Sequence, residues 1–147
     1  MAQSATVHPR SSWFATPDWV NTEIEVSVAT YEAYQILYYT FIVLMSVAGL
    51  DKFLHLLTTW ENYVSPGVAS FFHLSAGAVA VAAGLIELGI AAAVALKPRV
   101  GSWAVTIWLG LIVINLLTMG NHYETLLMTA ALVAGGVAFM RLSAECN

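Results

Sequence analysis

Apolar positions along the chain are gathered into four long runs, and polar and helix-breaking residues lie between them. The runs cover about residues 34–54, 68–96, 102–119 and 122–141. A helix needs about 20 residues to cross the hydrocarbon core of a bilayer, and each run approaches or exceeds that length. Long apolar runs are typical of helices that face lipid. The pattern therefore predicts four transmembrane helices in one domain over residues 34–142.

The connections between these runs are short, and each carries a turn signal. Pro66 precedes the second run, Lys97-Pro98-Arg99-Val100-Gly101 separates the second from the third, and Gly120-Asn121 separates the third from the fourth. Short connections place consecutive helices antiparallel. We therefore expect an all-α, integral membrane, up-down-up-down four-helix bundle, followed by a short tail over residues 143–147.

A polar segment, residues 1–33, comes before the first apolar run. It carries Trp13, Phe14 and Trp19, and tryptophan favours the headgroup layer of a membrane. Thr22-Glu23-Ile24-Glu25 matches a capping box, which marks a helix start. We expect a cytoplasmic, partly interfacial arm that leads into the first helix. The chain shows no secretory signal pattern, so the first span is expected to be retained as an anchor.

The composition supports the membrane assignment and excludes other classes. Of the 147 residues, 59% are hydrophobic and 10% are charged, with a net charge of −4. A soluble domain normally carries about 25% charged residues. There is no basic run, so a nucleic-acid partner is excluded. The single cysteine, Cys146, excludes an internal disulfide and a cysteine-based metal cage.

The cations predict an orientation. With four spans, Arg10, Lys97, Arg99 and Arg141 fall on one side of the membrane and Lys52 falls on the other. Loops rich in lysine and arginine stay in the cytoplasm. The sequence therefore predicts a multi-pass protein of the cell inner membrane with both termini cytoplasmic.

Several stretches resemble the DoxX family of small four-span bacterial membrane proteins. They are Ala48-Gly49-Leu50-Asp51-Lys52-Phe53, the run from Trp60 to Pro66, and residues 84–89 followed by 96–99. The resemblance covers about residues 34–142. It implies a four-helix membrane fold and redox work of the thiosulfate:quinone oxidoreductase type, with quinone as the cofactor class. The chain departs from that chemistry in having no cysteine within the four predicted spans.

Glu87 is the most informative residue for chemistry. It lies inside an apolar run, about 14 Å along the helix from the cytoplasmic end. A carboxylate in lipid costs about 2.5 kcal/mol or more, so Glu87 is expected to face the bundle interior, either protonated or partnered. Tyr38, Tyr39 and Thr106 are at comparable depth. The alternatives are a proton relay or ligand-binding carboxylate, and a hydrogen-bonded acid that specifies the fold.

A second group of residues gathers at the opposite, outer end. It comprises His55, His73 and His122 with Asp51 and Glu124. Imidazoles and carboxylates at one membrane level could hold a metal ion, a haem or a quinone headgroup. However, the histidines come from three different spans without the spacing that enforces a site. The alternative is a set of interface histidines that bond to water or loop backbone.

Two further polar residues are assigned structural roles. Lys52 is expected either to reach the outer headgroups or to form an ion pair with Asp51 or Glu61. The second role would tie the loop from Trp60 to Pro66 to the bundle. Asn115 is expected to make a hydrogen bond between helices.

Three functions remain open on this evidence. The favoured one is a non-catalytic scaffold or accessory subunit of a larger membrane complex, with electron transfer as its class. The first alternative is a redox or quinone-reactive subunit, and the second is a small oligomeric transporter. The expected partners are the lipid bilayer and either other membrane subunits or further copies of the chain.

Overall fold

The computed structural model describes residues 28–146, and every regular element within that range is a helix. In chain order the elements are α1 (Val28–Leu54), the short 3-10 helix η2 (Trp60–Tyr63), α2 (Pro66–Phe72), α3 (Ala76–Leu96), α4 (Pro98–Met119) and α5 (Tyr123–Cys146). Four of them, α1, α3, α4 and α5, are long and apolar enough to cross a membrane. The predicted all-α class and the four candidate spans are confirmed.

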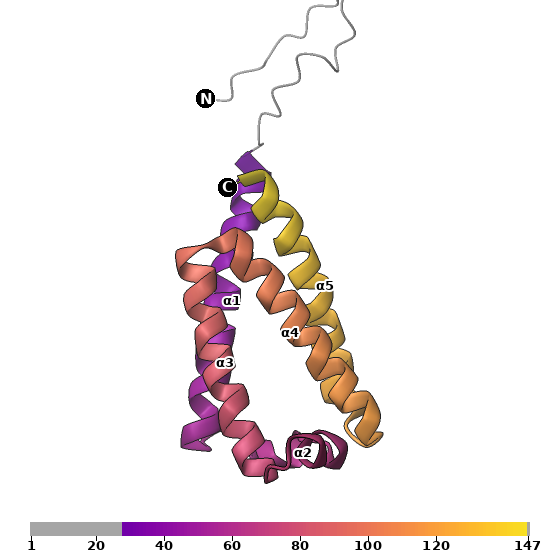
Figure 1. Cartoon of the computed structure of the whole chain (residues 1–147). Coiled ribbons are helices and arrows are strands. Elements are labelled where there is room, and N and C mark those ends of the chain that lie inside the picture. Colours follow the sequence, from indigo (N-terminus) through magenta and orange to yellow (C-terminus); the bar gives the residue numbers. More distant parts are fainter. Residues whose placement is uncertain (1–27, 147) are drawn as a thin grey trace, which may run out of the picture.

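The four long helices pack in a ring in which α1 contacts α3 and α5, and α4 contacts the same two helices. Figure 1 shows the start of α1, the α3–α4 turn and the end of α5 at one end of the molecule, here named the terminal end. The α4–α5 turn and α2 lie at the other end, here named the cap end. There the α1–α3 pair and the α4–α5 pair lie apart, and α2 lies between them in contact with α3 and α4 (Figure 1).

The predicted second span, residues 68–96, is not one continuous helix. It consists of α2 and α3, separated by a break at His73-Leu74-Ser75. His73 adopts a left-handed conformation with φ 54°, and the Ser75 hydroxyl caps α3 by accepting a hydrogen bond from the Ala78 N–H. The membrane-length helix therefore begins at Ala76, eight residues later than predicted.

At the C-terminal end, α5 continues through Cys146, so most of the predicted tail over residues 143–147 is helical. At the other end, α1 is described from Val28, within the region where the first helix is expected to start. The predicted arm, residues 1–33, is described only from residue 28 onward. Its tryptophans and its capping box lie outside the described residues.

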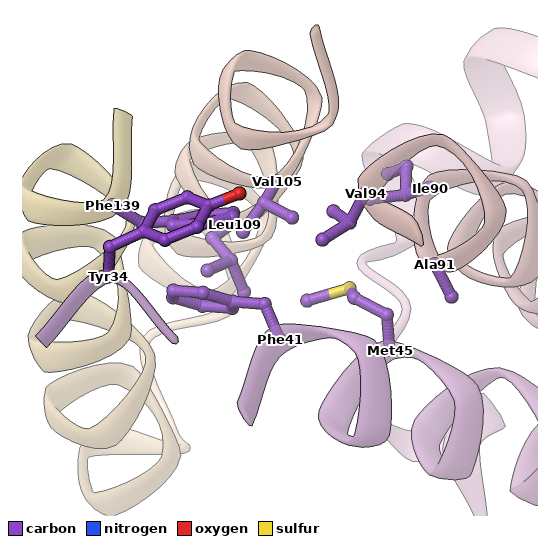
Figure 2. Packing of buried hydrophobic residues seen from close by; sticks show 9 residues of the cluster. All are labelled: Tyr34, Phe41, Met45, Ile90, Ala91, Val94, Val105, Leu109 and Phe139. Atoms are coloured by element: carbon purple, nitrogen blue, oxygen red, sulfur yellow. The ribbon is translucent and has the colours of Figure 1, made fainter. Parts of the chain in front are cut away.

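A hydrophobic core lies in the half of the molecule nearer the terminal end. All four long helices contribute to it, and the rings of Phe41 and Phe139 stack with centroids 5.6 Å apart. Its buried members are Tyr34, Phe41, Met45, Ile90, Ala91, Val94, Val105, Leu109 and Phe139 (Figure 2). Gly101 lies so close to α3 that an added Cβ would be 2.4 Å from Val94 Cα. The core is therefore closed by direct backbone contact at the α3–α4 turn.

The register of α1 on α3 is set by two facing glycines. A Cβ on Gly84 would lie 2.9 Å from the Gly49 carbonyl oxygen, and a Cβ on Gly49 would lie 3.0 Å from the Gly84 carbonyl oxygen. Small residues allow two backbones to approach this closely where lipid gives no hydrophobic drive for association. This crossing places the cap end of α1 against the middle of α3.

Candidate functional site

Helix α1 ends before it reaches the start of α3. Gly49 faces Gly84, which is eight residues inside α3, and only five residues of α1 remain beyond Gly49. The difference of three residues leaves α1 about 5 Å short. Residues 55–75 connect α1 to α3 and contain only the short helices η2 and α2. This connection is here named the cap segment. At its start, His55 adopts φ 53° and its N–H bonds to the Asp51 carbonyl oxygen at 2.7 Å, a left-handed helix C-cap.

Asp51 satisfies the backbone that follows. Its Oδ1 accepts the N–H groups of Leu56 and Leu57 at 2.8 and 2.9 Å, and its Oδ2 accepts Trp60 Nε1–H at 2.7 Å. Asp51 is only 3% exposed. Irregular backbone at membrane depth is tolerated only where its polar groups find partners. The carboxylate supplies those partners where α1 ends.

Asn115 of α4 performs the same role for the middle of the cap segment. Its Oδ1 accepts the Ser65 N–H at 3.0 Å, and its Nδ2 donates to the Tyr63 carbonyl oxygen at 2.6 Å. Beside it, His122 Nε2 lies 3.2 Å from the Asn62 carbonyl oxygen, and the His122 ring lies against Tyr63 with centroids 4.6 Å apart. These contacts bind the cap segment to α4 and to the α4–α5 turn.

Beneath the cap segment lies a buried ion pair. Lys52 Nζ of α1 is 2.6 Å from Glu87 Oε2 of α3, and the two side chains are 7% and 4% exposed. Trp108 Nε1–H of α4 donates to Glu87 Oε1 at 3.2 Å, so both carboxylate oxygens are engaged. Glu87 is eleven residues from the start of α3, about 16 Å along its axis. Three helices therefore meet on one carboxylate near the middle of a membrane-length helix.

Trp60 covers the lysine of this pair from the cap side. The Lys52 ammonium lies 3.7 Å from the centroid of the Trp60 ring, and it also donates to the Ala48 carbonyl oxygen at 3.4 Å. A desolvated ammonium over an indole gains about 2 kcal/mol. Asp51 holds the same indole by its N–H. Asp51, Trp60, Lys52, Glu87 and Trp108 thus form one connected network, here named the polar network.

The electrostatics explain why the network is continuous. A lysine or an acid near the bilayer centre costs about 2.5–3.5 kcal/mol on insertion scales. A buried pair recovers this cost only when its geometry is good and its remaining donors and acceptors are satisfied. Glu87 receives one donor on each oxygen, and Lys52 has a carboxylate, a carbonyl oxygen and an aromatic face. Each carboxylate oxygen of Glu87 is therefore bound to a side chain of another helix.

His55 and Glu61 form a separate contact on the exposed side of the cap segment. His55 Nε2 lies 3.2 Å from Glu61 Oε1, with side-chain exposures of 43% and 34%. A hydrogen bond from the backbone N–H of Glu61 itself, and then the His55 imidazole, hold the pKa of Glu61 below its ordinary value against partial desolvation. The second oxygen, Oε2, is buried and has no partner among residues 28–146.

The three outer histidines, considered above as a possible site, have separate contacts in the structure. His55 and His73 both occupy left-handed positions after helix ends, where histidine is enriched among residues other than glycine. His122 contacts loop backbone and Tyr63. Within the described residues, no group of three or more histidines, cysteines and acids could hold a metal ion. Glu124 lies exposed in the first turn of α5.

The predicted partners of the charged residues require two corrections. Lys52 is bound to Glu87 and not to Asp51, because adjacent residues on a helix do not face each other. Glu87 does face the interior, as predicted. Of its expected neighbours, Tyr38 donates instead to the Ala95 carbonyl oxygen and Thr106 to the Ser102 carbonyl oxygen. Tyr39 is 62% exposed.

Comparison with known proteins adds no relative. The sequence matches no family model, and neither a curated protein nor a solved structure is detectably similar to it. The resemblance to the DoxX family therefore stays a prediction from the motifs themselves.

One signal in the sequence could have revealed the ion pair. Lys52 and Glu87 each follow, by three residues, one of the glycines that set the crossing of α1 on α3. Two facing Gly-x-x patterns that end in opposite charges indicate a contact between the helices. The role of Trp60 carried no comparable signal, since a tryptophan in a membrane loop is also typical of an interfacial residue.

Proposed function

We propose that this protein is a small integral membrane subunit that acts as a non-catalytic scaffold or accessory within a larger membrane complex. The proposed topology is an up-down-up-down four-helix bundle with both termini cytoplasmic. Lys97, Arg99 and Arg141 support this orientation, because all three lie towards the terminal end. The motif resemblance favours an electron-transfer complex of the bacterial inner membrane.

The observation that carries the proposal is that the interior charges are bound to one another and to the fold. Both oxygens of Glu87 accept hydrogen bonds from side chains of α1 and α4, and Asp51 is bound by three donors of its own neighbourhood. These groups connect helices and satisfy irregular backbone. Their role is structural, because they hold the helices in a fixed arrangement to which partner subunits can bind.

The outward surface is consistent with this role. Large apolar side chains are exposed along every long helix, including Ile36 and Tyr39 on α1, Leu85 on α3 and Ile107 on α4. In a chain with four candidate spans such residues contact lipid or the helices of other subunits.

The pocket beside Tyr39, Thr40, Val43 and Leu44 lies on α1 alone, so a neighbouring helix could pack there without disturbing the polar network.

The test is to isolate the chain from its native membrane with its companions. A C-terminally tagged chain, expressed at its natural level and extracted in a mild detergent, should run on a native gel as one large species. Mass spectrometry should find other membrane proteins in fixed ratio to it. A chain that runs alone, or only with copies of itself, would contradict the accessory role.

The same preparation examines the quinone-reactive alternative. The purified chain, separated from its companions, should carry no visible chromophore and no stoichiometric quinone in a solvent extract. If the wild type retains bound quinone and Glu87→Gln does not, the redox function would replace the scaffold function as the better interpretation. Trp108→Phe is the matched control, because it removes a hydrogen bond to Glu87 and leaves the carboxylate in place.

A further inference from the structure

The cap segment carries exposed apolar side chains that the fold itself does not cover. They lie in two places, at the start of the segment and at the end of α2. Their exposed fractions are 78% for Leu56, 70% for Leu57, 77% for Phe71 and 60% for Phe72. Phe71 and Phe72 meet edge to face, with centroids 5.0 Å apart. A segment placed in water would not normally present such a set of large apolar side chains.

The hydrogen bonds of the cap segment show its depth along the helices. Ser65, the residue before α2, is bound to Asn115, which lies four residues before the end of α4, about 6 Å inside it. Leu57 is bound to Asp51, within α1, which itself ends about 5 Å inside the start of α3. Both points lie within the length of the spans and not beyond their ends. A helix of 21 residues such as α3 is about as long as the hydrocarbon core is thick, about 30 Å.

Continuity with the lipid-facing surface supports the same placement. Phe53 and Leu54, the last two residues of α1, are 42% and 59% exposed and lead directly into Leu56 and Leu57. Backbone groups of Leu57, Tyr63 and Ser65 are bound within the molecule, while polar side chains of the same segment, such as His55 and Asn62, are exposed beside the apolar ones. Exposed apolar and polar side chains side by side are what a segment at the border between acyl chains and headgroups needs.

The charge at this end bears on which lipid it meets. Residues 53–96 contain no lysine or arginine, and Lys52 is buried in its ion pair. Glu124 is exposed at the same end, and Glu61 is partly exposed. Anionic headgroups are attracted by clusters of lysine and arginine near the surface, and residues 28–146 place no such cluster at this end. The electrostatics favour zwitterionic lipid.

We propose that the cap segment is itself inserted in the membrane, with Leu57 and Phe72 at the border between the headgroups and the acyl chains of zwitterionic lipid. The connection between α1 and α3 is then a re-entrant interfacial element and not a loop in water. The left-handed ends at His55 and His73 turn the chain at this depth, and Asp51 and Asn115 supply the hydrogen bonds that lipid cannot.

Spin labels test this placement directly. Cys146 is the only cysteine, so Cys146→Ser provides a background for single-cysteine variants at Leu57 and Phe72. The labelled full-length chain is placed in nanodiscs of phosphatidylcholine, and power saturation compares molecular oxygen, which enters lipid, with a nickel chelate, which stays in water. Ile107→Cys, exposed in the middle of α4, and Asn121→Cys, in the α4–α5 turn at the cap end, are the lipid and water controls.

We expect the labels at positions 57 and 72 to be relaxed more by oxygen than by nickel, at a depth shallower than position 107. Exchange of part of the lipid for phosphatidylglycerol should not raise the oxygen accessibility of either label, and a rise would contradict the preference for zwitterionic lipid. A response like that of position 121 would overturn the proposal and would leave this surface free for a soluble protein partner. Low access to both reagents would also overturn it, in favour of contact between copies of the chain. Because all four positions are exposed, gel filtration should show the wild-type profile for each variant.

Discussion

The two halves of the molecule are held together by different chemistry. Towards the terminal end, four helices meet through apolar side chains, with Phe41 on Phe139 and Gly101 against Val94. Towards the cap end, the helices are joined by the polar network and by Asn115. The difference follows from the backbone. Where all four spans are helical, the main-chain groups are satisfied within the helices, and the helices are held together by the shapes of their side chains. Where α1 stops early, side chains have to supply partners.

The comparison suggests why charged residues occur in so apolar a chain. Asp51 is required where α1 ends inside the span, and its indole partner Trp60 then covers Lys52. Lys52 in turn neutralises Glu87. Each of these groups is the binding partner of the next, so substitution of any one of them is expected to destabilise the whole cap half. The terminal half is expected to respond residue by residue, according to the volume removed.

The largest expected effect is the loss of one member of the ion pair. Lys52→Met or Glu87→Leu leaves the other charge buried without its partner, which costs about 3–5 kcal/mol in the free energy of unfolding. Titration with a denaturing detergent in mixed micelles would measure it. Leu88→Met, a volume-conserving change beside Glu87, is the control. A single variant that unfolds like the wild type would show that the pair contributes little.

A somewhat smaller effect is expected in the terminal half. Phe139→Ala removes a fully buried ring from the core, with an expected loss of about 3 kcal/mol, near the low end of the known range because lipid replaces water as the surroundings. Phe139→Leu should cost less than about 1.5 kcal/mol. If Leu were as harmful as Ala at this position, specific ring contacts and not volume would govern the core.

Asn115 is expected to show an intermediate effect at the cap end. Asn115→Leu leaves the Ser65 N–H and the Tyr63 carbonyl oxygen without their partner, which costs about 1–3 kcal/mol. Hydrogen exchange should report the loss at the Ser65 amide, while the amides of α5 keep their protection. Equal loosening of both regions would contradict the separation into two halves.

The smallest effect should come from Glu61. Because its folded pKa lies below the ordinary value, its contribution to stability is present above that ordinary value and is lost as the pH falls through the folded pKa. The unfolding free energy of the wild type, compared with Glu61→Gln between pH 7 and pH 3, should fall slightly more steeply in that acidic range. If the unfolding free energy of Glu61→Gln fell more steeply with decreasing pH than that of the wild type, the direction of the Glu61 pKa shift would be wrong.

The sequence predicted the terminal half better than the cap half, for a physical reason. Lipid-facing helices are recognisable from apolar runs, so the four spans and the inward face of Glu87 were predictable. The break at His73-Leu74-Ser75 was missed, because both flanking segments are apolar and only the serine caps mark the helix starts. A span that starts at Val68 puts Glu87 19 residues from its outer end, whereas in the structure Glu87 is eleven residues from the start of α3.

The roles of the histidines were harder to predict. Sequence shows that His55, His73 and His122 lie near one end, but not that two of them occupy left-handed positions and the third binds a loop carbonyl. Those roles depend on backbone angles and on the packing of distant segments. Asp51 was likewise assigned to a neighbouring charge, whereas its partners are backbone groups created by the early end of α1.

The central claim of the proposed function is that the interior charges hold the structure and carry no reaction. The double variant Lys52→Met/Glu87→Leu, studied in the native complex, tests it most directly. Replacing both charges with apolar groups of similar size removes the requirement for pairing, so stability should return to within about 1 kcal/mol of the wild type, and the complex should assemble and work normally. A double variant that folds and assembles like the wild type, yet leaves the complex inactive, would contradict the account and assign chemistry to the pair.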